Sequence, residues 1–212
     1  MIRTIIDQIK TAITSKPYVE RFGGVVMPVT RFDEVDEGMV LRQTFPISPQ
    51  VTGLQCWEQG RYHDLVPNDQ YKSIFYFEEL DGMQTNSRRK VKDHMVEHRG
   101  RVRLVGWLNL QKLGIENEYN VAERIAFQLA GDIEGTYQLS APLSKAMATI
   151  TPIGIQPKSA NIFDRYTYDN ESGFLLYPFD FFAFDFEVLL SLKLDCIDEI
   201  TISSPIACID LS

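Results

Sequence analysis

The sequence from residue 181 to residue 194 reads FFAFDFEVLLSLKL and alternates between two kinds of side chain. Every even position is apolar: Phe182, Phe184, Phe186, Val188, Leu190, Leu192 and Leu194. The odd positions are mixed: Phe181, Ala183, Asp185, Glu187, Leu189, Ser191 and Lys193. Successive side chains of a β-strand point to opposite faces, so this pattern predicts a strand with one face in the core and the other toward water or a polar partner. At about 3.3 Å per residue the strand would extend roughly 45 Å, and something equally long must lie beside it.

Two other segments have helical periodicity. Apolar side chains recur every three or four residues in 2–13 and in 121–130, which predicts two amphipathic helices. Asn120, followed by Glu123, predicts a capping box at the start of the second helix. With several alternating strands, these segments indicate an α+β fold: a mainly antiparallel sheet with two principal amphipathic helices packed on one face.

The chain is expected to form one domain over residues 1–212. Long loops are predicted near 46–70 and 132–160, and an irregular C-terminal arm at 195–212. Gly23-Gly24 predicts a turn, and Pro28 favours a sheet edge or a bulge for the short strand around it. Gly106 marks a bulge or a close approach inside a strand over 102–110.

Composition restricts the functional classes. The 212 residues include 21 basic and 29 acidic ones, and the net charge of −8 opposes nucleic-acid binding over the whole surface. Apolar content of 44% and charged content of 24% are typical of a folded globular chain. Cys56, Cys196 and Cys208 have no ligand-like pairing and favour synthesis in a reducing cytoplasm. No signal peptide or membrane span is expected.

One short motif resembles a metal site. His94-Met95-Val96-Glu97-His98 has the H-x-x-E-H pattern of inverted zinc peptidases, in which a helix places the two histidines one turn apart. The cationic neighbours, Gly100 and the absence of an identified third ligand favour a solvated charged segment instead. A metal-dependent hydrolase that uses His94, Glu97 and His98 is therefore the alternative function, and no cofactor or metal is expected.

Basic residues are concentrated in one region. They are Arg88, Arg89, Lys90, Lys92, Arg99, Arg101 and Arg103. This group predicts an electrostatic contact with phosphate or with an acidic partner, and an exposed hairpin or loop is an equally weighted interpretation. The acidic run from Asp33 to Glu37 is interpreted as a solvated turn rather than a calcium loop. Ordinary packing is favoured over catalysis for Cys56 and His63.

Aromatic residues gather before and within the 181–194 segment: Phe174, Tyr177, Phe179, Phe181, Phe182, Phe184 and Phe186. One interpretation is a thick core between sheet and helices. The other is a subunit interface, for which Phe179, Phe181, Asp185 and Glu187 are the candidates. The two interpretations differ in whether the second face of the strand is covered by the chain itself.

The order of these segments resembles that of tail terminator and related neck, or head-tail joining, proteins of tailed bacteriophages. The resemblance covers the helix over 2–13, the strand over 101–110, the helix over 121–130 and the strand over 181–194. It implies a noncatalytic subunit without a cofactor, which forms a homo-oligomeric ring around the DNA passage and joins the head-side connector to the tail. It also implies other phage neck or tail proteins as partners, nonspecific proximity to DNA, no membrane association, and a place in the virion after synthesis in the host cytoplasm.

Overall fold

The computed structural model describes most of the chain: residues 2–35, 39–48, 65–85, 95–115, 117–139, 146–156, 158, 162–167 and 175–193. Several predicted features lie outside these residues. They are His63, His94, the four basic residues Arg88, Arg89, Lys90 and Lys92, Phe174, the three cysteines, the end of the acidic run at 36–37, and the expected arm at 195–212.

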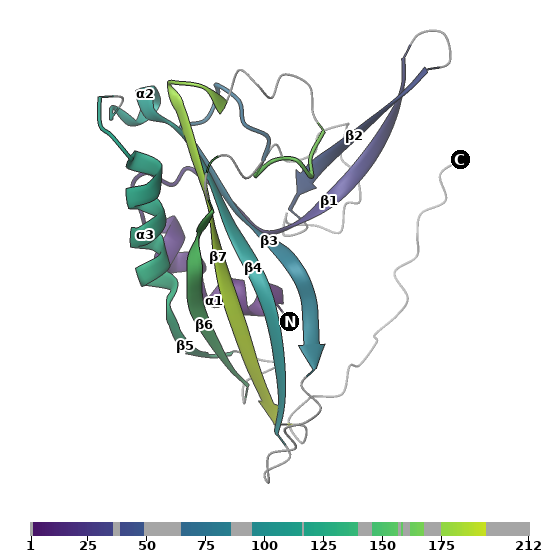
Figure 1. The fold of residues 1–212 in the computed structure, drawn as a ribbon, viewed down its shortest axis with the longest axis vertical. Coiled ribbons are helices and arrows are strands. Elements are labelled where there is room, and N and C mark those ends of the chain that lie inside the picture. The colour runs from purple at the N-terminus through teal and green to yellow at the C-terminus, as the bar shows by residue number, and fades with distance from the viewer. Residues whose placement is uncertain are drawn as a thin grey trace.

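Seven strands form one sheet in the order β2-β1-β3-β4-β7-β6-β5 (Figure 1). The strands are β1 (Arg21–Val35), β2 (Met39–Ile47), β3 (Ser73–Thr85), β4 (Met95–Asn109), β5 (Gly135–Gln138), β6 (Met147–Gln156) and β7 (Phe179–Lys193). The helices of the described residues are α1 (Ile2–Thr14), α2 (Leu110–Leu113) and α3 (Val121–Ile133). None of these helices is long and apolar enough to cross a membrane.

The sheet is mixed, so the expectation of a mainly antiparallel sheet covered by two principal helices is wrong. β1 runs parallel to β3, from the pair Arg21↔Ile74 to the pair Val26↔Glu78. Strands predominate, and the described helices are three short ones. Alternation indicates which face of a strand is buried but not its direction, so the sequence could not reveal the parallel pair. The path from β1 to β3 through β2 and residues 48–72 provides the long connection that parallel pairing requires.

The two segments predicted as long loops, 46–70 and 132–160, also contain strand residues. β2 continues to Ile47, beyond the predicted loop start at residue 46. The segment 132–160 contains β5 and most of its described remainder is β6. β6 forms because its β-branched residues pair with β7, from Met147↔Ser191 onward. Its alternating apolar residues predict a strand over 146–155, and β6 confirms it within one residue at each end.

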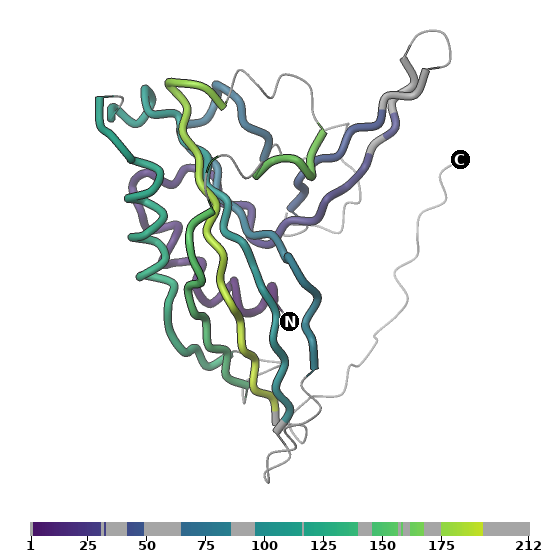
Figure 2. Tube along the Cα trace, in the orientation of Figure 1, coloured from purple at the N-terminus to yellow at the C-terminus, as the bar shows by residue number. Residues whose placement is uncertain are grey.

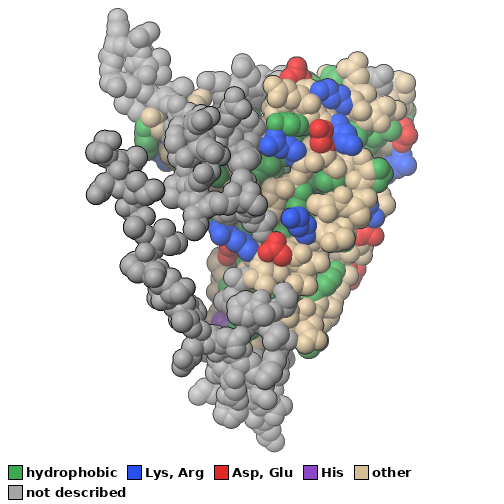
Figure 3. All heavy atoms as spheres, turned by 180° about the vertical axis from the view of Figure 1, so that it is seen from behind, with side chains coloured by type: hydrophobic (Ala, Val, Ile, Leu, Met, Phe, Trp, Pro, Cys, Tyr) green, Lys and Arg blue, Asp and Glu red, His purple; other side chains and the backbone are tan. Residues whose placement is uncertain are grey.

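The long C-terminal strand is confirmed as the middle of the sheet. β7 pairs along its whole length with β4, from Phe179↔Asn109 to Lys193↔Met95, and β6 lies on its other side. Its even positions from Phe182 to Leu192 are all buried. They pack against residues of α1 and α3. In the view of Figure 2, α1 passes behind the strands and α3 lies to the left of β6. Seen from behind, the described surface on this helical side mixes cationic and anionic side chains (Figure 3).

The opposite face of the sheet is also buried around Trp107 and Tyr76, which the sequence did not indicate. Trp107 and Tyr76 belong to a second core, which residues 162–167 and Leu65 help to cover. Trp107 stacks on Phe179, with ring centroids 5.2 Å apart. This face was expected to meet water or a polar partner, because the odd positions of β7 are mixed in polarity. The covering segments are remote in sequence, so no local pattern could predict them.

β1 changes partner along its length. Its first half pairs with β3, and the second half, Met27–Val35, pairs with β2. The expected turn at Gly23-Gly24 is instead a bulge, where the register shifts between Phe22 and Val25. Gly24 has a φ of 62°, which favours glycine. Beyond the bulge the β1–β2 hairpin projects away from the other strands (Figure 1).

α3 begins without the predicted capping box. Asn120 has a left-handed backbone, and its side chain makes no cap hydrogen bond. Asp180, at the start of β7, instead accepts a hydrogen bond from the backbone N–H of Ala122 at 3.2 Å. It also accepts from the backbone N–H of Phe181 and from the ammonium group of Lys158. A carboxylate at this position satisfies a free helix donor and interacts favourably with the helix dipole.

Candidate functional site

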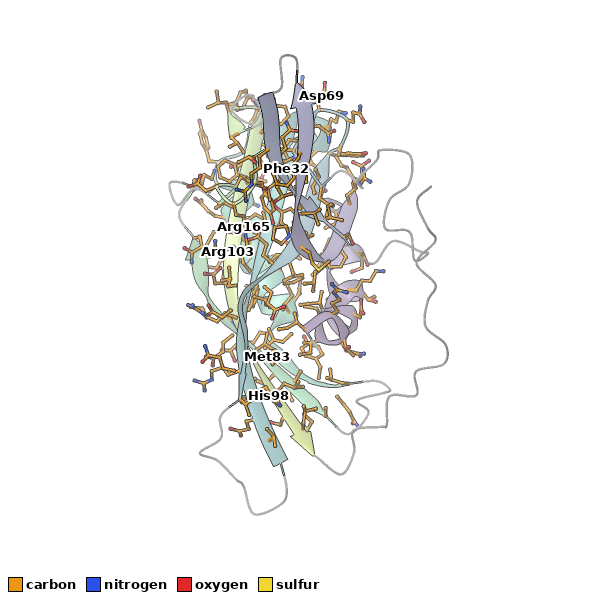
Figure 4. All side chains as sticks on the ribbon, turned by 90° about the vertical axis from the view of Figure 1, so that its right-hand side faces the viewer. Phe32, Asp69, Met83, His98, Arg103 and Arg165 are labelled. Carbon is orange, nitrogen blue, oxygen red and sulfur yellow. The ribbon has the colours of Figure 1, made fainter. Side chains whose placement is uncertain are left out.

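Arg103 and Asp185 join the two central strands on the face opposite the helices. The guanidinium of Arg103 donates from Nε to Asp185 Oδ1 at 2.7 Å and from Nη2 to Oδ2 at 3.1 Å. Gln156 Nε2 donates to the same Oδ2 at 2.7 Å. The hydrogen bond to Asp185 is the largest cause that raises the pKa of Arg103, and partial burial opposes it. Three strands therefore meet in one polar cluster, on the same side as Arg165 (Figure 4).

Two further arginines of β4 pair within the chain. Arg101 donates to Asp81 of β3 at 2.5 Å, and Arg99 lies 3.5 Å from Glu187 of β7. Both pairs are substantially exposed. The structure thus brings together residues that the sequence assigned to two separate surfaces, namely the basic region and the candidate interface. Contact of these arginines with a partner stays a prediction, and it would have to compete with these intrachain partners.

Phe179 and Phe181 are half-buried and pack within the chain. Phe179 stacks on Trp107, and Phe181 meets the ring of Phe163 edge-on at 5.5 Å. Both belong to the margin of the second core. The candidate interface formed by Phe179, Phe181, Asp185 and Glu187 therefore has much of its surface engaged by the chain itself.

A buried carboxylate holds residues 162–167 against the sheet. Glu78 of β3 is 1% exposed. Its Oε1 accepts from the hydroxyl of Tyr166 at 2.5 Å, and its Oε2 accepts from Arg165 at 3.2 Å. Tyr166 also packs edge-on against Tyr76, with centroids 6.4 Å apart. Burial of a carboxylate is unfavourable unless hydrogen bonds replace its water, so these two donors stabilise the attachment.

Tyr166→Phe should lower the free energy of unfolding by about 1–3 kcal/mol, because the ring remains while buried Glu78 loses a donor. Urea denaturation of both proteins measures the difference. Tyr119→Phe is the matched control, because Tyr119 is 89% exposed and its hydroxyl change should alter stability by less than about 0.5 kcal/mol. Equal stability of the two variants would show that the Tyr166 hydroxyl does not stabilise the fold.

The histidine motif does not have the geometry of a helical zinc site. Glu97 and His98 lie in β4, where adjacent side chains point to opposite faces. The ring nitrogen Nδ1 of His98 lies 3.1 Å from the hydroxyl of Thr85. His94 is outside the described residues. Within the described residues, no group of three or more His, Cys, Asp or Glu side chains could hold a metal ion.

The projecting hairpin is a structural feature that the sequence did not single out. Phe32 of β1 is 66% exposed, opposite Arg42 of β2, and Figure 4 places it on the hairpin. In the Met27–Val35 half of β1, one edge pairs with β2. No described strand pairs with the other edge of this half. The other edge of β2 contacts Thr167 through an isolated bridge. Alternation in β1 was obscured by Pro28 and the acidic residues, so the length of the hairpin was not predicted.

An apolar groove of about 400 Å³ lies between the end of α1 and the start of α3. Tyr18, Leu113, Ile115, Val121 and Ile125 contribute to its lining. Burial, with a smaller contribution from Asp132, raises the pKa of Tyr18 to about 12.

The same groove has a polar rim. Glu118 and Arg124 form an ion pair of 2.6 Å, and Gln128 also contributes to the lining. The residues come from three separate segments, and no sequence motif connects them. Comparison of the whole chain with protein-family models, with curated proteins and with solved structures finds no match.

Proposed function

We propose that this chain is a noncatalytic structural subunit of the neck or tail of a tailed bacteriophage. It forms a ring around the DNA passage and joins the head-side connector to the tail, in the virion, after synthesis in the host cytoplasm. The observation that carries the proposal is the β1–β2 hairpin, which leaves the sheet and presents an aromatic side chain, Phe32, to the outside. An element that extends beyond its own core is suited to contact another subunit.

The central strands support a structural role. Side-chain hydrogen bonds connect β4, β7 and β6 through Arg103, Asp185 and Gln156. The hydrogen bond between Arg101 and Asp81 connects β4 to β3. These polar groups satisfy one another across the sheet instead of converging on an open cavity. A sheet connected in this way is rigid, as the sheet of a ring subunit needs to be. The net charge of −8 would also limit adhesion of passing DNA.

Native mass spectrometry tests the proposal. The purified chain should give a discrete multiple of its 24.3 kDa mass, and electron microscopy of the same sample should show closed rings. A monomer at every concentration examined would contradict the proposal. In a second experiment, phage neck and tail proteins are added to the same sample. They should bind the ring rather than the isolated subunit.

The alternative hydrolase is tested in the same preparation. The ring proposal predicts that His94→Ala and His98→Ala leave the number of subunits in the oligomer unchanged. A zinc hydrolase predicts one bound metal per chain, lost in both variants together with turnover. Metal analysis beside native mass spectrometry therefore separates the two functions.

A further inference from the structure

We propose that the hairpin of one subunit inserts Phe32 into the groove between α1 and α3 of a second copy of this chain. The inference rests on the proposed ring function and names its subunit contact. Both halves of the contact consist of described residues: Phe32 on the hairpin, and Tyr18, Leu113, Ile115, Val121 and Ile125 in the groove. Neither feature is used by the intrachain ion pairs of the sheet.

The two surfaces match in size and polarity. A cavity of about 150 Å³ already accommodates a benzene ring, and the groove of about 400 Å³ has room for the Phe32 ring and part of the hairpin backbone. The hydroxyl of Tyr18 is neutral at physiological pH, as that of an ordinary tyrosine is, so its side chain adds no charge to the lining. Large aromatic side chains that fill pockets commonly dominate the affinity of protein interfaces.

Charges beside the two surfaces are complementary. Arg42 lies directly across the hairpin from Phe32, so it is on the same face of the strand pair. The groove has both Glu118 and Arg124 at its rim, exposed and paired with each other. On contact, Arg42 can meet Glu118, which favours one orientation of the inserted strand pair.

The placement of the two surfaces is suited to a ring. The hairpin extends to one side of the sheet, and α2 and the start of α3, which line the groove, lie on the other side (Figure 1). The contact is therefore heterologous: each subunit offers a hairpin to one neighbour and a groove to the other. Such a contact closes into a ring when the rotation between subunits is a simple fraction of a turn.

The test uses two single variants that each remove one half of the contact. Phe32→Asp replaces the inserted ring, and Gln128→Trp fills the groove from an exposed position of α3. Each variant alone should raise the concentration for half-assembly by about 30-fold or more, as for a strong interface residue. Circular dichroism confirms that both retain the fold. Ile153→Asp is the matched control, because Ile153 is 55% exposed on β6 and should leave assembly unchanged.

Mixing the variants gives the decisive result. Phe32→Asp retains a groove and Gln128→Trp retains a hairpin, so a 1:1 mixture should give a species of two chains and no larger ring. The inference is overturned if the mixture stays monomeric, if Phe32→Asp assembles like the wild type, or if Ile153→Asp disrupts assembly equally. In these cases a wild-type ring would leave the proposed function intact. A wild type that never assembles would overturn both.

Discussion

Replacing Arg103 by methionine is expected to lower the free energy of unfolding by about 3–5 kcal/mol. The side chain of Asp185 is only 9% exposed, and Arg103 supplies two of the three hydrogen bonds described for its carboxylate. Methionine occupies similar space but leaves this carboxylate with Gln156 alone. Guanidinium chloride would screen ion pairs, so urea denaturation followed by circular dichroism is the appropriate measurement.

A double variant separates the loss of the ion pair from the burial of an unpaired charge. Arg103→Met combined with Asp185→Leu removes both charged groups, and should recover at least about 2 kcal/mol relative to Arg103→Met alone. Arg124→Met is the control, because the exposed pair of Arg124 and Glu118 should contribute at most about 1 kcal/mol. If Arg103→Met and Arg124→Met had the same effect, the Arg103 pair would not be important for the fold.

Gly106→Val should destabilise the chain by about 3 kcal/mol or more, through overpacking. A Cβ atom at this position would lie 2.4 and 2.6 Å from two ring carbons of Phe182, and 3.0 Å from a ring carbon of Phe75. Both rings are buried and lie on the strands that flank Gly106. Neither ring can move without displacing the core beneath the helices.

Thermal and urea unfolding of Gly106→Val should both show the loss. Gly82→Val is the control in the same sheet, because no atom lies within 4 Å of a Cβ built at Gly82. The double variant Gly106→Ala with Phe182→Leu should be more stable than the sum of its single changes predicts, since the smaller side chain relieves the contact. Additive single changes would mean that the ring of Phe182 is not what excludes a side chain at residue 106.

These predictions concern the same central strands but different causes. Arg103 stabilises the face that carries the polar cluster, and Gly106 allows close packing on the helical face. Loss of either should weaken the sheet from which the hairpin projects. Assembly experiments on Phe32 and Gln128 therefore need fold-matched variants, because a destabilised sheet would impair a ring without any change at the contact.

The candidate site was partly visible in the sequence. Arg99, Arg101, Arg103, Asp185 and Glu187 were singled out, but as two surfaces that meet partners. The structure pairs Arg103 with Asp185, although 82 positions separate them. Charge patterns along a chain do not reveal which strands become neighbours, so the internal pairing could not be foreseen. The groove was missed for the same reason, because its lining comes from three segments.

Local periodicity in the chain was enough to fix two features: the buried face of β7, from Phe182 to Leu192, and the apolar stripe of α1. Both depend on the direction of neighbouring side chains, which the backbone geometry sets over a few residues. Long-range pairing decided the rest: the parallel β1–β3 contact, the cover over Trp107, and the use of Asp180 at the start of α3. These features depend on which distant segments lower the free energy most when they pack together. No local sequence pattern indicates which segments those are.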